Sequence, residues 1–285
     1  MPDERTAFQL EIERVIEYTY DFRFRSADSL ITRLRQRFPE RPMTHLTSAN
    51  LGWWRLISGD DRPEVRTSFL TDLDRVLTLM RDPGNESLTH EQLFILINTY
   101  SFRARLDLMD GHMFRGLLHL GDCLRYLRKS LGQESVFEPL YFTSGLYNFF
   151  CDYGMQNYPL LYPSLLVLPR GDMATGRRQL EMASRSAEKW LSTEGHYFLL
   201  KIKLDLDEKP LDALDHARWL TTRFPGNLVY QELLYRIMTL SGNTKEAQAR
   251  LQTLREAAAG NNELSASQKN HFLSLPRDGI RRISN

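Results

Sequence analysis

The stretch "ALDHARWLTTRFPGNL", residues 213–228, contains the pattern that decides the fold. Ala213, Ala217 and Leu220 follow one another at the three- and four-residue spacing of one helix face. Pro225 then stops the helix, because proline has no backbone N–H with which to continue it. The stretch therefore predicts a helix with two small residues on its inner face, followed by a tight turn.

The same pattern recurs elsewhere in the chain. A shift of 34 residues moves Ala213 onto Ala247, and the next two positions onto leucines. A copy near the start of the chain ends in "RFPERP", residues 37–42, which matches "RFPGNL", residues 223–228. Its members, with the same twelve-residue step from alanine to proline, are Ala27, Ile31, Leu34 and Pro39. Repeated helical hairpins are therefore expected.

Most of the remaining sequence also has helical spacing, and the alternation typical of strands is nearly absent. Capping boxes at Thr89 and Ser265 mark two helix starts, and Gly59 and Gly242 are placed as glycines that end helices. We therefore expect an all-α protein. The predicted helices cover residues 4–22, 26–38, 43–58, 63–81, 89–110, 112–131, 134–155, 172–191, 194–207, 210–223, 227–241, 244–258 and 265–274.

Two further segments place a small, a large and a small residue at equal offsets. They are Gly116, Leu120 and Cys123 in one segment and Gly176, Leu180 and Ala183 in the other. A minimal side chain at such a position lets the two helices of a hairpin approach closely. Because Gly116 and Gly176 lie 60 residues apart instead of 34, extra chain separates them, including a proline- and aromatic-rich insertion at 156–170.

On these residues the chain resembles tetratricopeptide repeat proteins, whose signature has this period and ends in the same alanine and proline positions. Within that group, "GLYNFF" at 145–150 and "PRGDMATGRRQL" at 169–180 look like a divergent bacterial branch of unassigned function. The resemblance implies a right-handed solenoid of about six stacked hairpins, forming a single domain over residues 1–285. It also implies a non-catalytic scaffold whose concave face binds a peptide or protein segment.

The aromatic residues around the 156–170 insertion have two possible explanations. In the first, they pack the connection over a hairpin, and Asp172 caps the helix that follows. In the second, the connection folds over a groove, and Tyr147, Tyr153 and Tyr158 anchor a partner. Tyrosine suits that role because it combines apolar area with a hydroxyl group.

Further candidate contacts are a tryptophan and three arginines. Trp53 and Trp54 diverge by about 100° on a helix, so one is expected in the core and the other half exposed; we predict Trp54 as a contact. Arg103, Arg105 and Arg177 carry planar guanidinium groups that suit the carboxylates of a peptide. Salt bridges between helices are the alternative explanation for these arginines.

Charge and hydropathy argue against several classes of partner. The 37 Lys and Arg residues balance 36 Asp and Glu residues, and the two signs are interspersed, so no basic field for nucleic acid is expected. The longest apolar run, residues 160–168, is too short to span a bilayer. The N-terminus lacks a signal-peptide pattern, which predicts a cytoplasmic protein, or a periplasmic one if a leader has been removed.

Catalytic and metal-binding patterns are weak. His112, His119 and Cys123 share a predicted helix, but no second ligand cluster is visible, so no metal site is expected. A nucleophile elbow, a phosphate loop and a paired-carboxylate signature are all absent from the sequence. We therefore expect neither an enzyme nor a cofactor. The alternative is a helical toroid that binds or hydrolyses a carbohydrate, or binds another small ligand, in a pocket under the 156–170 connection.

Overall fold

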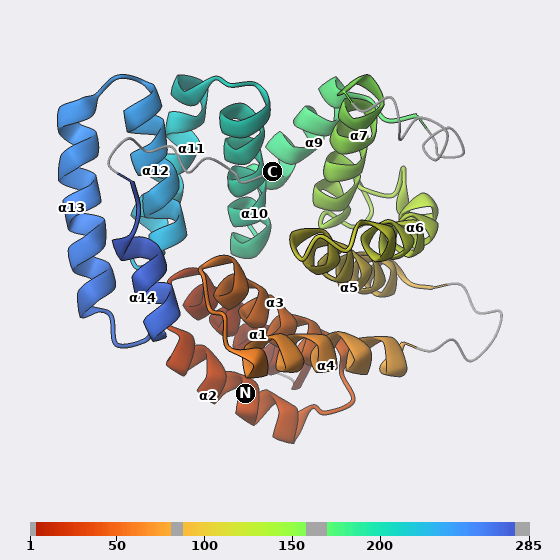
Figure 1. Ribbon diagram of the computed structural model, residues 1–285. Coiled ribbons are helices and arrows are strands. Elements are labelled where there is room, and N and C mark those ends of the chain that lie inside the picture. The colour runs from red at the N-terminus through yellow and green to blue at the C-terminus, as the bar shows by residue number, and fades with distance from the viewer. Residues whose placement is uncertain (1–3, 81–87, 158–169, 277–285) are drawn as a thin grey trace. The chain divides into compact units, whose positions relative to one another are not determined.

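The structure, a computed structural model, describes residues 4–80, 88–157 and 170–276 and contains no strand within these ranges (Figure 1). The predicted all-α class is confirmed. The helices are α1 (Glu4–Tyr20), α2 (Phe24–Arg37), α3 (Pro42–Ile57), α4 (Pro63–Leu79), α5 (His90–Met109), α6 (Met113–Ser130), α7 (Leu140–Asn157), α9 (Met173–Ser184), α10 (Lys189–Lys201), η2 (Ile202–Leu206), α11 (Pro210–Arg223), α12 (Leu228–Leu240), α13 (Thr244–Gly260) and α14 (Ala266–Leu273).

The chain divides into two compact units. Unit 1 contains residues 1–39, 47–72 and 196–285, and unit 2 contains residues 40–46 and 73–195. Unit 1 therefore draws on both ends of the sequence, whereas unit 2 is built from its middle.

In unit 1, the turn that the sequence repeats has the same structure both times. Helix α2 ends at Arg37 and α11 at Arg223, and each is followed by a phenylalanine with nearly the same backbone angles. The N–H of Phe38 donates to the carbonyl of Leu34, and that of Phe224 to the carbonyl of Leu220. The predicted equivalence of these two turns is confirmed.

The first hairpin of unit 1 also contacts the turn between α11 and α12. The N–H of Gly226 donates to Oδ1 of Asp21 at 2.8 Å, and Nδ2 of Asn227 donates to the carbonyl of Tyr20 at 2.7 Å. These bonds join segments more than 200 residues apart. In a linear solenoid each hairpin contacts only its neighbours in the sequence. The expected sequential stacking is therefore not confirmed.

An aromatic cluster forms much of the core of unit 1, and Trp54 lies within it. Its side chain is 2% exposed, and its ring centroid lies 5.5 Å from that of Tyr20 and 5.3 Å from that of Tyr230. The prediction that Trp54 is an exposed contact is therefore wrong. Trp53 is the half-buried member of the pair and packs on Phe69 of α4.

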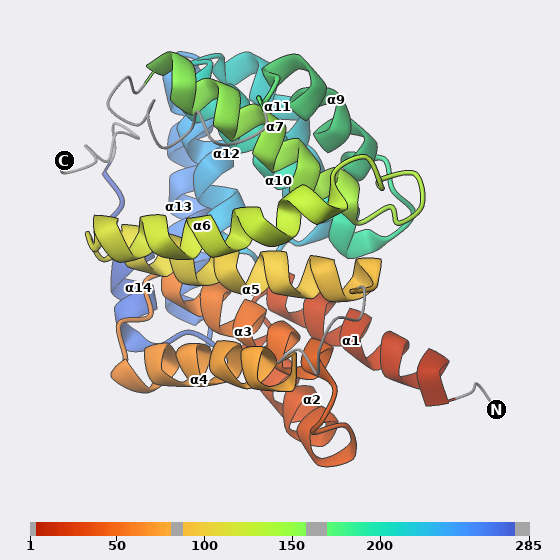
Figure 2. The same ribbon diagram turned by 90° about the vertical axis from the view of Figure 1, so that its right-hand side faces the viewer.

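Unit 2 contains two helical hairpins, α5–α6 and α7–α9, whose helices lie side by side (Figure 2). The α7–α9 pair is in close backbone contact at Gly176. A Cβ atom added there would lie 2.5 Å from the backbone N of Phe149 and 2.7 Å from the carbonyl O of Gly145. The expected close approach at this glycine is confirmed, and Asp172 caps α9 as predicted, accepting from the N–H of Thr175.

The helix expected over 172–191 is two helices. Helix α9 ends at Ser184 and α10 begins at Lys189, and the two backbones then lie close together: a Cβ on Gly195 would lie 2.5 Å from the N of Ser184. The helix expected over 134–155 begins only at Leu140. The helix expected over 194–207 ends in a π-helical turn, η2, which the sequence pattern did not indicate.

Candidate functional site

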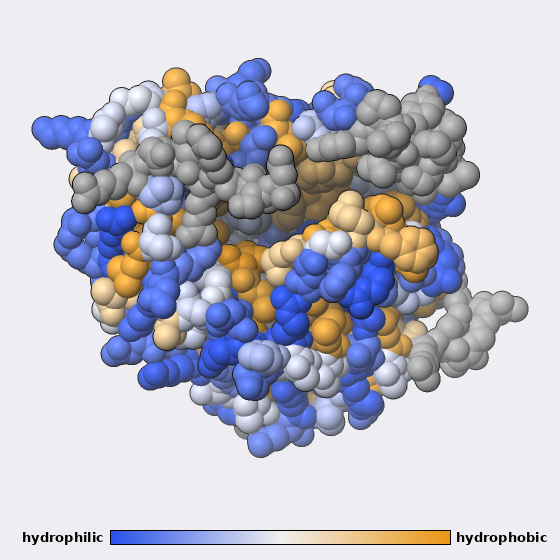
Figure 3. All heavy atoms as spheres, in the orientation of Figure 1, coloured by the Kyte–Doolittle hydropathy of each residue, from blue (hydrophilic) through white to orange (hydrophobic). Residues whose placement is uncertain are grey.

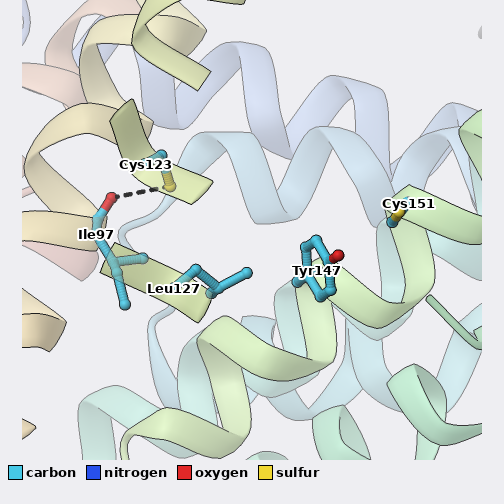
Figure 4. Close-up of a cluster of buried hydrophobic side chains, with 5 residues drawn as sticks. All are labelled: Ile97, Cys123, Leu127, Tyr147 and Cys151. Carbon is cyan, nitrogen blue, oxygen red and sulfur yellow. Dashed lines mark hydrogen bonds between the residues drawn. The ribbon is translucent and has the colours of Figure 1, made fainter. Parts of the chain in front are cut away.

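The inner face of α6 packs within unit 2 through Cys123 and Leu127. Cys123 and Leu127 of α6 form a buried cluster with Ile97 of α5 and with Tyr147 and Cys151 of α7 (Figure 4). The thiol of Cys123 donates to the carbonyl of Ile97 at 3.5 Å, and burial raises its pKa to about 12. A thiol in this state is neutral and unreactive, so this side of α6 holds the hairpins together.

The outer face of α6 is apolar as well, and it is exposed. Phe114 is 75% exposed and Leu118 is 56% exposed. We define the α6 surface as the exposed apolar side chains at this end of the α5–α6 hairpin: Leu108, Met109, Met113, Phe114, Leu117 and Leu118. Figure 3 shows hydrophobic side chains gathered where Figure 1 places α6. Contiguous exposed apolar groups of this kind typically mark interaction sites.

Polar contacts with Asp107 tie α6 to α5 beside this surface. Nη2 of Arg115 lies 3.1 Å from Oδ1 of Asp107, and Nε2 of His119 lies 3.5 Å from Oδ2. Together with the buried cluster, they fix which face of α6 turns outward. Among the described residues, no group of three or more His, Cys, Asp or Glu side chains is arranged to hold a metal ion.

The tyrosines predicted as anchors are largely engaged in packing. Tyr147 is 7% exposed and forms a side-chain hydrogen bond with Cys151, so its prediction as an exposed anchor is wrong. The ring of Tyr153 stacks on that of Phe149 at 5.9 Å between centroids, and the guanidinium of Arg177 lies over the same ring at 4.8 Å. These contacts favour the packing explanation. Tyr158 lies outside the described residues.

The other two arginines also have intramolecular contacts. Arg103 forms an ion pair with Asp74 of α4, which agrees with the salt-bridge explanation. Desolvation by burial lowers its pKa. The guanidinium of Arg105 lies 5.7 Å from the centroid of the Phe102 ring. These arginines therefore contribute to packing within unit 2.

A second polar cluster, in unit 1, was not found in the sequence. Nδ1 of His196 on α10 lies 2.8 Å from Nδ1 of His216 on α11, and Nζ of Lys203 on η2 lies 3.0 Å from Nε2 of His216. The His196 ring stacks on Trp219 with centroids 4.1 Å apart. The π-helical turn displaces Lys203 from ordinary helical spacing, which is why no motif linked these residues.

The donor and acceptor capacity of these groups determines which ring nitrogens of the cluster carry a proton. An ammonium group can only donate, so Nε2 of His216 accepts from Lys203. Nδ1 of His216 then carries the proton and donates to Nδ1 of His196. This chain requires both rings to be neutral. Burial, and then the positive charge of Lys203, lower the pKa of each histidine to about 4, while Asp215 acts in the opposite direction on His216.

We expect this cluster to make the protein sensitive to acid. The unfolded chain binds protons at its histidines below about pH 6.5, whereas the folded pair binds them only near pH 4. The contribution of the neutral histidine pair to the free energy of unfolding is therefore complete above pH 6.5. The free energy of unfolding falls as the pH is lowered from 6.5 to 4. Urea unfolding followed by circular dichroism at pH 7 and pH 5 should show a lower midpoint at pH 5.

Two variants test the origin of this effect. His216→Gln removes one titrating ring and should reduce the difference between the two pH values by about half. Lys203→Gln should reduce it less, because burial is the larger cause of the lowered pKa values. An unchanged pH dependence in His216→Gln would contradict the assignment.

Comparison with known proteins does not identify the chain: no family model matches it, and no curated protein or solved structure shows significant similarity. No helix within the described ranges is long and apolar enough to cross a bilayer. Of the His196–His216 cluster and the α6 surface, the α6 surface is the one formed by exposed side chains.

Proposed function

We propose that the protein is a non-catalytic helical binding protein that docks a protein or peptide segment on the α6 surface. The observation that carries the proposal is the exposure of Phe114 and Leu118 on the outer face of a helix whose inner face is already packed. Full burial of one such side chain contributes about 1.5 to 3 kcal/mol. Because association itself costs about 4 to 15 kcal/mol, several of these side chains have to be buried together.

Kinship with tetratricopeptide repeats is part of the same proposal. The two equivalent turns after α2 and α11 support it, as does the confirmed close approach at Gly176. The docking surface proposed here differs from the concave face that the resemblance implies. The alternative of a small-ligand toroid depends on a pocket beneath residues 156–170, most of which lie outside the described residues.

The proposed function predicts that Leu118→Asp abolishes docking while the fold is retained. A charge on the α6 surface opposes burial there, whereas the free protein tolerates it because the Leu118 side chain is 56% exposed to water. Val136→Asp, at an apolar residue of unit 2 that is 67% exposed and lies outside the surface, is the matched control. A photo-reactive phenylalanine analogue at position 114 should cross-link a specific protein from host lysate.

In this experiment, quantitative mass spectrometry should show at least a tenfold loss of the cross-linked protein with Leu118→Asp. With Val136→Asp the yield should equal that of the parent protein. Circular dichroism establishes that both variants are folded. Equal yields from the two variants would contradict the proposed docking surface.

A further inference from the structure

The outer face of α6 changes character along its length, and this bears on the partner that the proposed function requires. Phe114, Leu118, Gly121, Arg125 and Lys129 follow one line along the helix at three- and four-residue spacing, and all are exposed. The first half of this line is apolar and the second half is basic. The same helix thus presents two adjoining surfaces of different chemistry.

The basic half of this line has a local positive charge, although the chain as a whole is nearly neutral. The whole protein has a formal net charge of +1. Arg115 is held by Asp107, whereas Arg125 lies 3.4 Å from the hydroxyl of Tyr126 and pairs with its helix neighbour Asp122 at 3.3 Å. Such a surface pair is weak and exchangeable. The end of α6 that contains Arg125 and Lys129 is therefore complementary to carboxylates.

Gly121 lies between the two halves and faces open space among the described residues. A Cβ atom added to it would meet no atom within 4 Å, whereas one added to Gly116 on the inner face would lie 2.8 Å from Leu108. Glycine weakens an exposed helix relative to alanine. Its effect here is to leave the helix backbone open to close approach from outside, as at helix crossings.

We infer that the occupant of the α6 surface is an amphipathic helix of another protein, with acidic residues toward one end. Its apolar side chains cover Phe114 and Leu118, its backbone crosses α6 at Gly121, and its carboxylates face Arg125 and Lys129. In this mode of recognition, an amphipathic helix binds through apolar side chains at three- and four-residue spacing. The inference depends on the proposed function, because it names the partner of the same site.

A membrane surface fits the arrangement less well. An interfacial helix has basic residues beside an apolar stripe that runs along its whole length. On the outer line of α6, Arg125 and Lys129 follow the apolar residues instead of flanking them, and lipid does not require the open backbone at Gly121. A partner helix uses both features.

Selection from a displayed library of helical peptides tests the inference. Each peptide has about 20 residues, or more than five turns, with leucine or phenylalanine along one stripe of one half. Along the same stripe of the other half, Glu, Gln or Lys is placed at random, and both orders of the halves are included. The library is selected on the full-length protein and, in parallel, on Leu118→Asp.

We expect peptides with Glu to be enriched at least tenfold over peptides with Lys on the parent protein. The double variant Arg125→Glu, Lys129→Glu should reverse that preference, and Gly121→Leu should reduce binding of the selected peptides at least tenfold. Equal enrichment of Glu and Lys peptides, or an unchanged preference in the double variant, would overturn the acidic helix while the docking surface stands. Failure to enrich any peptide over Leu118→Asp would overturn both.

Vesicles of phosphatidylcholine with phosphatidylserine provide the other arm of the test. We expect the parent protein to remain in the supernatant when they are sedimented. Sedimentation that Leu118→Asp abolishes would assign the surface to a membrane and would overturn the helix partner.

Discussion

Replacing Trp54 with alanine is expected to lower the free energy of unfolding by about 4 kcal/mol, because it removes the centre of the aromatic cluster of unit 1. The indole is 2% exposed and lies among rings from three other parts of the unit. Its neighbours include Tyr20 of α1, Tyr197 of α10 and Tyr230 of α12. These segments are distant in the sequence, so the resulting cavity cannot be closed by a local shift of one helix.

Chemical denaturation of Trp54→Ala beside Trp53→Ala measures this difference. The two tryptophans are adjacent on α3, but Trp53 is half-buried, with its ring centroid 6.2 Å from that of Phe69. Its replacement should therefore cost clearly less than that of Trp54. A larger loss in Trp53→Ala would mean that the core of unit 1 is wrongly assigned.

The local features of this chain could be predicted from its sequence because their causes are local. The capping boxes at Thr89 and Ser265 need only a residue three positions away, and both are formed. Gly59 and Gly242 have positive φ angles, as expected of glycines that end helices. The repeated turn after α2 and α11 likewise depends on a few adjacent residues.

The burial of Trp54, and not of Trp53, could not be predicted in this way. Helical spacing establishes that Trp53 and Trp54 point in different directions, but the choice of buried face depends on Tyr197 and Tyr230. Those residues are more than 140 positions away in the sequence. The His196–His216 pair was missed for a similar reason, since its two rings meet only through the packing of α10 on α11.

The α6 surface could not be recognised from the sequence because α6 has apolar residues on both of its faces. Gly116 and Cys123 correctly indicated the inner face of the helix, but their pattern makes no prediction for the apolar residues on the opposite face. A signal was present: Phe114 and Leu118 lie on the side of the helix opposite the small residues. An apolar residue on that side of a two-helix hairpin needs a partner from outside the hairpin.

Replacing Gly176 with alanine is expected to lower the free energy of unfolding by about 3 kcal/mol, since the new methyl group has no room. The atoms that it would meet, the N of Phe149 and the O of Gly145, belong to the backbone of α7 and cannot rotate away. Helices α7 and α9 would have to separate, which would also loosen the contact of Leu180 with Gly145. The loss can be measured by urea unfolding followed by circular dichroism.

The matched control is Gly121→Ala, the same substitution in a helix of the same unit at a position with open space. There, alanine should raise the free energy of unfolding by about 0.5 to 1 kcal/mol, because it favours the helical conformation more than glycine does. Opposite signs for the two substitutions would separate the steric effect from helix propensity. A gain in both variants would show that α7 and α9 are not in close contact at Gly176, and the hairpin of unit 2 would have to be reassigned.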